Sequence, residues 1–143
     1  MAIFIYYVSQ KKLQVIGASG SYSIRATSGK GACMNVSTCQ TKKNIGPIPK
    51  GQYYILKGDL SNPGFIKDIA RNTRGDWGDW RIPIHSVGQT KVYGRSGFFM
   101  HGGSWDGSAG CIDVGGGIFG NETSNRVLKS IKSSSERIQL WVY

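Results

Sequence analysis

The chain opens with seven apolar residues, AIFIYYV (2–8), followed by the polar segment SQKK (9–12) and a second apolar run, LQVI (13–16). Two β-prone runs separated by a short polar segment predict a β-hairpin at the N-terminus. Working outward from this hairpin, we expect further extended segments at residues 22–27, 52–56, 80–84, 97–100 and 138–143. Residues 28–46, rich in Ser, Thr, Asn, Gly and Lys, are expected to form a loop.

Helical patterns are rare in the remaining sequence. Residues 121–133 predict one late helix, because Val127, Leu128 and Ile131 fall on one face and Asn121 is suited to cap it. A single helical turn is expected at residues 65–69. Pro83 lacks an amide proton and predicts an edge position for its strand. The sequence therefore predicts one mainly β domain over residues 1–143 with one late helix.

Composition excludes two broad classes of protein. Hydrophobic residues make up 39% of the 143 residues and charged residues 18%, which does not fit a disordered chain. The longest apolar run is far shorter than the ~20 residues of a membrane-spanning helix. A chain of this length is expected to bury roughly two-thirds of its unfolded surface and to form a core of its own.

Positive charge is concentrated in the N-terminal part of the chain. The sequence has 18 Lys and Arg against 8 Asp and Glu, a net charge of +10, and residues 1–50 contain no acidic residue. This distribution favours an anionic partner, which could be nucleic acid, lipid headgroups or an acidic cell-wall polymer.

The N-terminus and the cysteines bear on the compartment. No Lys or Arg precedes the apolar run 2–8, so we interpret it as a strand and expect no conventional signal peptide. Cys33 and Cys39 enclose a short polar loop and could form a disulfide in an oxidising compartment, or all three cysteines could be reduced. Cys111 is the odd one out.

The segment FFMHGGSWDGSAGCID (98–113) contains the most informative chemistry. A cysteine nucleophile needs an imidazole to take its proton and backbone N–H groups to hold the oxyanion. A strand ending at His101, a glycine-rich loop and Gly110-Cys111 entering the next strand could supply all three. Gly110 would let a substrate carbonyl approach the backbone beside the thiol. From spacing alone, Cys111 and His101 could also be structural, since a lone Cys is more often a small buried apolar residue and a lone His is usually structural.

Two motifs carry a resemblance to a known family. His101-Gly102 followed by Ser108-x-Gly110-Cys111-Ile112 resembles the signature of the YkuD-type L,D-transpeptidases, cysteine enzymes that act on peptidoglycan. GPIPKGQY (46–53) resembles their upstream turn and strand. The form GSAGCID (107–113) is similar to the L,D-transpeptidase-like effectors of bacterial type VI secretion. In these motifs Ala109 replaces a second His of the wider family, and Asp113 replaces an Arg.

The resemblance implies an L,D-transpeptidase-like β-sandwich and acyl transfer through a thioester on Cys111. His101 would accept the thiol proton and return it to the leaving group. The expected reaction is cleavage of the L,D bond before the terminal D-Ala of a tetrapeptide stem, as an L,D-carboxypeptidase, or exchange for another D-amino acid. Gly110, Ser108 and Gly102 would support the loop and the oxyanion.

Four further residues are candidates for substrate binding. Asp113 lies two residues after Cys111 and could orient a substrate amine or make a structural hydrogen bond. Trp105 could line the cleft or pack under the loop. Arg81 could contact the acidic stem together with its neighbour Trp80, and His85 is expected at the end of a strand near the cleft.

The implied partners are peptidoglycan stem peptides, a periplasmic immunity protein and a component of the secretion apparatus, with no cofactor, no metal and no nucleic acid. The protein would be an antibacterial toxin, made in the cytoplasm and acting in the periplasm of target bacteria. One alternative is a cationic module that binds nucleic acid or anionic surfaces. Another is an NlpC-type cysteine peptidase, whose nucleophile precedes its histidine, the reverse of the order His101, Cys111. A zinc peptidase would need three ligands at recognisable spacing.

Overall fold

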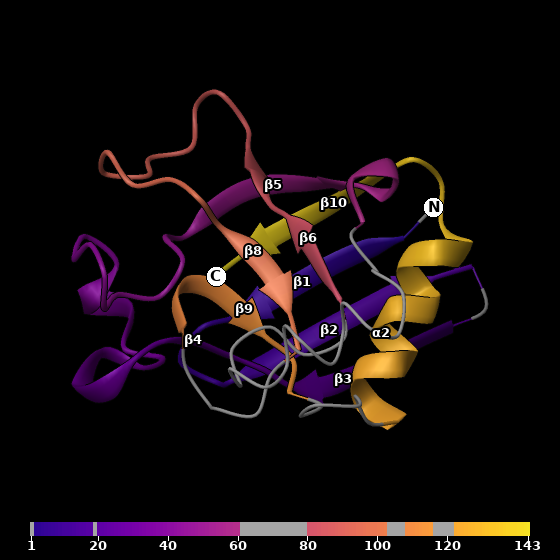
Figure 1. The fold of residues 1–143 in the computed structure, drawn as a ribbon, viewed down its shortest axis with the longest axis horizontal. Helices are drawn as coiled ribbons and strands as arrows, with labels where there is room; N and C mark the ends of the chain where they lie inside the picture. Colours follow the sequence, from indigo (N-terminus) through magenta and orange to yellow (C-terminus); the bar gives the residue numbers. More distant parts are fainter. Residues whose placement is uncertain (1, 19, 61–79, 103–107, 116–121) are drawn as a thin grey trace, which may run out of the picture.

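Two β-sheets packed face to face enclose one apolar core (Figure 1). The structure, a computed structural model, describes residues 2–18, 20–60, 80–102, 108–115 and 122–143, and at residues 108, 109 and 122 only the backbone. In Figure 1 the smaller sheet lies in front of the larger one, and the late helix lies at one side. The fold is mainly β with one late helix in the described residues, as the sequence predicts.

The larger sheet has the strand order β3-β2-β1-β10-β5-β7. Its strands are β1 (Ile3–Tyr7), β2 (Lys12–Gly17), β3 (Gly20–Arg25), β5 (Gly51–Leu56), β7 (His85–Ser86) and β10 (Arg137–Val142). The predicted hairpin is confirmed, because β1 pairs antiparallel with β2 from Tyr7 opposite Lys12. The last strand, β10, lies parallel to β1 and antiparallel to β5.

The smaller sheet has the order β4-β9-β8-β6. Its strands are β4 (Thr27–Gly29), β6 (Arg81–Pro83), β8 (Phe99–His101) and β9 (Ser108–Asp113). Pro83 lies in β6 at one edge of this sheet, which confirms the edge position that its missing amide proton predicts. Strands β8 and β9 run parallel, with His101 opposite Asp113.

The predicted third strand, 22–27, is wrong as one strand, because the chain changes sheet at Ala26. The Ala26 N–H donates to the Lys11 carbonyl of the large-sheet hairpin, at 3.0 Å, and the Ala26 carbonyl accepts a hydrogen bond from the Tyr6 hydroxyl at 3.2 Å. Strand β3 ends before this residue in the larger sheet, and β4 begins after it in the smaller one. The predicted strand 80–84 also ends where the chain passes from β6 in one sheet to β7 in the other. Strands that switch sheets close the corners of such a sandwich.

Helix α2 (Glu122–Ser133) confirms the predicted late helix. Val127, Leu128 and Ile131 are all buried in the core, as their spacing predicts. The helix packs beside β3, where the Tyr22 hydroxyl lies 2.7 Å from Ser130 Oγ. The expected cap Asn121 and the expected turn at 65–69 lie outside the described residues. In the described part of the chain, no helix is long and apolar enough to span a membrane.

The predicted loop 28–46 contains two short 3₁₀ helices, η1 (Gly31–Cys33) and η2 (Ser37–Cys39). Cys33 and Cys39 form a disulfide, with their Cα atoms 5.6 Å apart. We call residues 30–50 the disulfide lobe. Asn35 anchors this lobe to β1, because its amide donates to the Tyr6 hydroxyl at 2.8 Å and to the Val8 carbonyl at 2.6 Å.

Candidate active site

The outer face of the smaller sheet brings together three of the residues that the sequence singled out, Arg81, His101 and Asp113. Side chains alternate between the two faces of a strand, and Ile82, Met100 and Ile112 are fully buried in the core between the sheets. Their neighbours Arg81, His101 and Asp113 therefore lie on the opposite face. The register brings these three together across three strands, because Arg81 pairs with His101 and His101 pairs with Asp113.

His101 and Cys111 form a hydrogen-bonded pair on the parallel strands β8 and β9. Both are buried, with exposed fractions of 2% and 7%. His101 Nδ1 lies 2.7 Å from the carbonyl oxygen of Gly102. Because a carbonyl only accepts, Nδ1 carries the proton of that bond, and Nε2 is left as the nitrogen that can take a proton from a neighbour.

Five effects act on the pKa of His101. Burial lowers it, because a buried imidazolium loses its hydration, but the hydrogen bond and the charge of Cys111 act in the opposite direction. The charge of Asp113 and the hydrogen bond to Gly102 raise it further, so that the pKa of His101 lies above its ordinary value of 6.5. The raised pKa makes His101 a stronger base for the proton of the Cys111 thiol.

Asp113 is the carboxylate next to this pair, and only 4% of it is exposed. Its Oδ1 accepts a hydrogen bond from the Gly115 N–H at 2.8 Å, and its charge acts on His101. The bond to Gly115 is the structural hydrogen bond that the sequence left open for Asp113, and its role toward a substrate amine stays a prediction.

Gly110 precedes Cys111 at a place where a side chain does not fit. Its φ is +72°, and a Cβ would lie 2.6 Å and 2.7 Å from two ring atoms of Phe98 and 3.1 Å from Arg95 Nη2. Its N–H donates to the carbonyl of Gly46 at 2.9 Å. The need for glycine here therefore arises from backbone conformation and from contact with Phe98, in addition to any approach by substrate.

The same hydrogen bond brings the two sequence motifs together, because Gly46 begins the upstream motif and Gly110 belongs to the downstream one. Within the upstream motif, the Tyr53 hydroxyl donates to the Pro49 carbonyl at 2.7 Å, which fixes the turn to the strand that follows. The ring of Tyr53 packs edge-on against Phe98, with centroids 6.1 Å apart.

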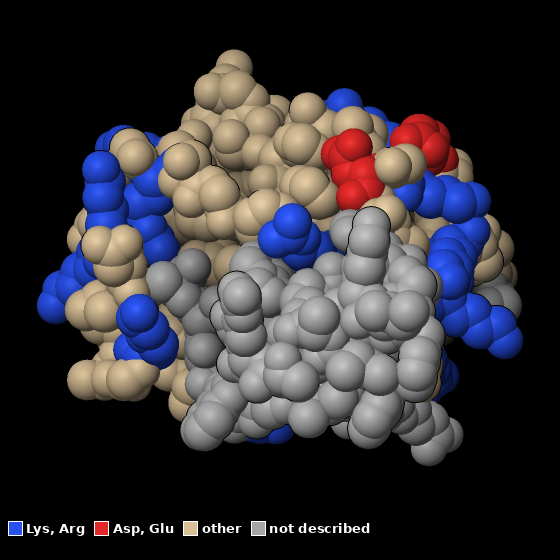
Figure 2. Space-filling model, viewed as in Figure 1, with Lys and Arg blue, Asp and Glu red and all other residues tan. Residues whose placement is uncertain are grey.

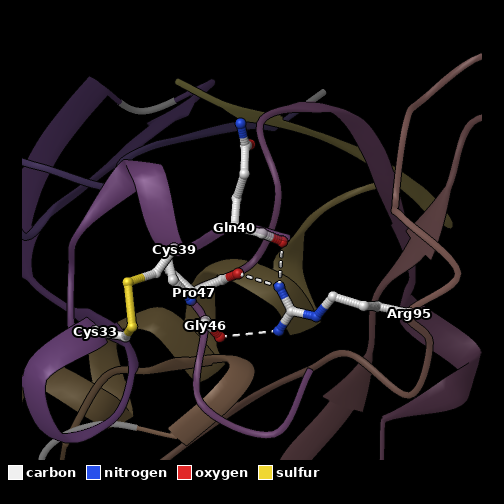
Figure 3. The surroundings of a disulfide bond; sticks show 6 residues. All are labelled: Cys33, Cys39, Gln40, Gly46, Pro47 and Arg95. Carbon is white, nitrogen blue, oxygen red and sulfur yellow. Dashed lines mark hydrogen bonds between the residues drawn. A yellow bond between two sulfur atoms is a disulfide. The ribbon is translucent and has the colours of Figure 1, made fainter. Parts of the chain in front are cut away.

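Arg95 is a site neighbour that sequence reasoning missed. It is buried beside Gly46, and its guanidinium donates to three carbonyl groups of the disulfide lobe (Figure 3). Burial lowers its pKa, while Tyr53 acts in the opposite direction. The only signal in the sequence is a lone arginine in the polar turn before Phe98, which does not distinguish it from a surface residue.

The other predicted site residues are placed as follows. Arg81 is half-buried beside His101, with its guanidinium 5.2 Å from the centre of the Phe99 ring. The backbone of Ser108 pairs with Gly29, and its side chain is outside the description. Trp105 also lies outside the described residues. Trp80, which was expected to contact substrate with Arg81, is fully buried in the core.

The structure does not bring His85 to this site. It lies on β7 in the larger sheet, where its ring stacks on Tyr54 at 5.1 Å and its Nε2 lies 2.9 Å from Asp59 Oδ2. Tyr54 alternates with the buried Tyr53 and Ile55, so this cluster lies on the outer face of the larger sheet. His101 lies on the outer face of the other sheet.

Lysines gather on the disulfide lobe. Lys30, Lys42, Lys43 and Lys50 are exposed, and the lobe contains no acidic residue. Figure 2 shows Lys and Arg side chains over this end of the molecule, and the acidic side chains of this face lie at its far end. Within the described residues, no three His, Cys, Asp or Glu side chains lie close enough to hold a metal ion.

Comparison with known proteins shows the family of the chain and a solved structure with a similar fold. The family model of the Tlde1 domain matches residues 23–133, which include both sequence motifs. No curated protein sequence matches the chain. The structure of Bdellovibrio bacteriovorus Bd1075 is similar over 99% of this chain, with a TM-score of 0.57 and 16% sequence identity. The similar region is 47% of Bd1075, so this chain spans about half the length of that protein, and the likeness is one of fold.

Proposed function

Because the chain belongs to the Tlde1 domain family of type VI secretion L,D-transpeptidase effectors, we propose that it is a cysteine enzyme that trims peptidoglycan stem peptides. In this proposal residues 1–143 form one catalytic domain. Its substrate is the tetrapeptide stem, and the bond cleaved is the L,D bond before the terminal D-Ala. The observation that carries the proposal is the buried, hydrogen-bonded pair of His101 and Cys111.

The first half of the reaction forms a thioester. The Cys111 sulfur attacks the carbonyl carbon of the residue before D-Ala, and the thiol proton passes to Nε2 of His101. The hydrogen bond from Nδ1 to the Gly102 carbonyl supports this role, because it fixes the tautomer and orients the ring. The protonated His101 then gives its proton to the nitrogen of the departing D-Ala.

The second half of the reaction consumes the thioester. Water attacks the acyl carbon to release the tripeptide stem, or the amine of another D-amino acid attacks it to give an exchanged stem. His101 takes the proton of the attacking group, and Cys111 regains its proton as it leaves. Trimmed stems cannot donate to new crosslinks, which is how the enzyme would weaken the wall of a target cell.

The negative charge that develops on the attacked carbonyl oxygen needs hydrogen-bond donors to stabilise it. We assign this role to the Cys111 N–H together with a neighbouring N–H of the loop, and loss of one such donor typically lowers turnover by ~10²–10³. The Gly110 N–H already donates to Gly46, which supports a role in holding the loop. Ser108 is assigned to the loop as well.

Substrate contacts are proposed for the residues around the pair. Asp113 and Arg81 flank His101 in the register of the smaller sheet, so they offer one negative and one positive group to the charged ends of a stem peptide. Trp105 would line the cleft. The lysines of the disulfide lobe would hold the anionic wall polymer by an interaction that weakens as salt is added.

The remaining parts of the proposal concern the cell. The enzyme would reach the periplasm of a target bacterium through a component of the type VI apparatus, and a periplasmic immunity protein would protect kin. His85 is left out of the chemistry, because its position on the other sheet supports a structural role.

Incubation with purified tetrapeptide muropeptides, with and without an added D-amino acid, tests the proposal. Mass spectrometry should find stems that have lost one D-Ala, and exchanged stems when the D-amino acid is present. Cys111→Ala and His101→Ala should abolish both products, while His85→Ala should keep them. Intact stems with the wild-type protein would refute the proposal.

A further inference from the structure

The guanidinium of Arg95 is buried against main-chain carbonyl groups. Arg95 is 7% exposed. Nη1 donates to the carbonyls of Gln40 and Pro47, at 2.6 Å and 2.7 Å, and Nη2 donates to the carbonyl of Gly46 at 2.9 Å (Figure 3). In the described part of the chain no carboxylate pairs with it. A buried cation is costly unless its donors are satisfied, so the fixed fork of arginine is well suited to this place.

One of these carbonyls also accepts a hydrogen bond from β9, the strand that carries the proposed nucleophile. The Gly46 oxygen accepts from Arg95 Nη2 and also from the Gly110 N–H, both at 2.9 Å. A carbonyl oxygen has two lone pairs, so it can accept both bonds at once. The direction of the Gly46 carbonyl therefore depends on Arg95, and the position of Gly110 depends on that carbonyl.

Arg95 also packs against Gly110 from the side. Its guanidinium carbon lies 5.6 Å from the centre of the Phe98 ring, and both groups lie against the place where a Gly110 Cβ would be. Gly46 itself packs tightly on the backbone of Cys39 and Lys42, where a Cβ would clash. The contact therefore runs from the disulfide, through Gly46, to the residue before Cys111.

We infer that Arg95 is a positioning residue for Cys111. It fixes the direction of the Gly46 carbonyl, which accepts the hydrogen bond from the Gly110 N–H. The position of Gly110 in turn determines where the Cys111 sulfur lies relative to His101. Arg95 touches neither the thiol nor the imidazole in this account, and it acts through the backbone. The inference rests on the proposed function, because it takes Cys111 as the nucleophile.

Arg95→Lys tests the inference, because a lysine keeps the charge but replaces the planar fork with a single ammonium. A nucleophile misplaced by about 1 Å can lose ~10²-fold in rate. We expect kcat on tetrapeptide muropeptides to fall by roughly 10- to 100-fold, with KM within about twofold of the wild type. Arg137→Lys is the matched control, because Arg137 lies over Tyr54 on the outer face of the larger sheet and should keep both constants.

A second readout needs no substrate. With the Cys33–Cys39 disulfide intact, Cys111 is the free thiol of the chain, so its rate of alkylation by iodoacetamide reports its surroundings. Arg95→Lys should change this rate severalfold and Arg137→Lys should not, at a temperature where circular dichroism finds both folded. If the wild type trims no stem, the proposed function fails, but the alkylation experiment still decides the place of Arg95.

A third readout is hydrogen exchange, measured first on the wild type. If Arg95 and Gly46 hold Gly110 in place, the Gly110 amide of the wild type should exchange with deuterium as slowly as the core amides of strand β9. In Arg95→Lys this amide should exchange faster than its neighbours in β9. Fast exchange of Gly110 in the wild type would overturn the inference. The inference would also be overturned if Cys111 of Arg95→Lys were alkylated at the wild-type rate. A raised KM with an unchanged kcat in that variant would overturn it too.

Discussion

Substitution of Gly110 by alanine tests how the backbone before Cys111 is held. Two costs follow from the structure. A φ of +72° places an L-residue in the left-handed region, at roughly 1–2 kcal/mol. The new methyl group would also lie 2.6 Å from the Phe98 ring, and overpacking of this kind costs roughly 1–3 kcal/mol. We therefore expect Gly110→Ala to lower the free energy of unfolding by about 2–5 kcal/mol.

Gly97→Ala is the matched control, because it separates the two costs. Gly97 has nearly the same φ, +75°, but apart from its chain neighbours no atom of the described residues lies within 4 Å of a Cβ at that position. This substitution should cost only the backbone term of roughly 1–2 kcal/mol. It should also leave muropeptide trimming largely intact, whereas Gly110→Ala should lower trimming at least tenfold, because it displaces the residue that precedes the nucleophile.

Chemical denaturation followed by near-ultraviolet circular dichroism measures both stabilities. A third variant checks the proposed clash, because Phe98→Leu in the Gly110→Ala background removes the ring that the methyl group meets. The two substitutions should then cost less together than the sum of their separate costs. Our reasoning is refuted if Gly110→Ala costs no more than Gly97→Ala and shows no coupling to Phe98→Leu.

Three further predictions concern the pKa of His101 and the disulfide. Cys111→Ala and Asp113→Asn should each lower the pKa of His101, since Cys111 and Asp113 both raise it. NMR titration of the imidazole measures this pKa, and an unchanged value in either variant would contradict the prediction. Because the folded pKa of His101 is raised, its protonation stabilises the fold fully below pH ~6.5, and this stability should be lost as pH rises through the folded value. Unfolding curves at several pH values should show this loss, and a smaller loss in Asp113→Asn. Replacing Cys33 and Cys39 by serine should lower the free energy of unfolding by about 2 kcal/mol, as expected for so short a loop. A reductant should have the same effect on the wild type and none on the double variant.

The hairpin and the late helix could be predicted because their signals are local. The run 2–8, its polar turn and the run 13–16 determine their own pairing. The parallel pairing of β1 with β10 joins the two ends of the chain, and no local pattern in either strand encodes its partner. The change of sheet at Ala26 was missed for the same reason, since it depends on Lys11 and Tyr6.

The candidate site could be predicted where its chemistry requires particular residue types. Cys111 stood out as a nucleophile and His101 as its base, and the register of β8 and β9 brings them together. Arg95 could not be found this way, because all three of its hydrogen bonds go to main-chain carbonyls. Every residue has a carbonyl, so such an acceptor leaves no mark in the sequence. His85 was misplaced because its partner Asp59 is fixed by tertiary structure.

The central claim is that Cys111 carries the acyl group, and trapping that intermediate tests it most directly. Wild-type protein mixed with tetrapeptide muropeptide and quenched in acid should gain the mass of the muropeptide acyl group that remains after loss of the terminal D-Ala. Peptide mapping should place that mass on Cys111, and Cys111→Ala should gain none. Trimming by Cys111→Ala at the wild-type rate, or an adduct on another residue, would contradict the account.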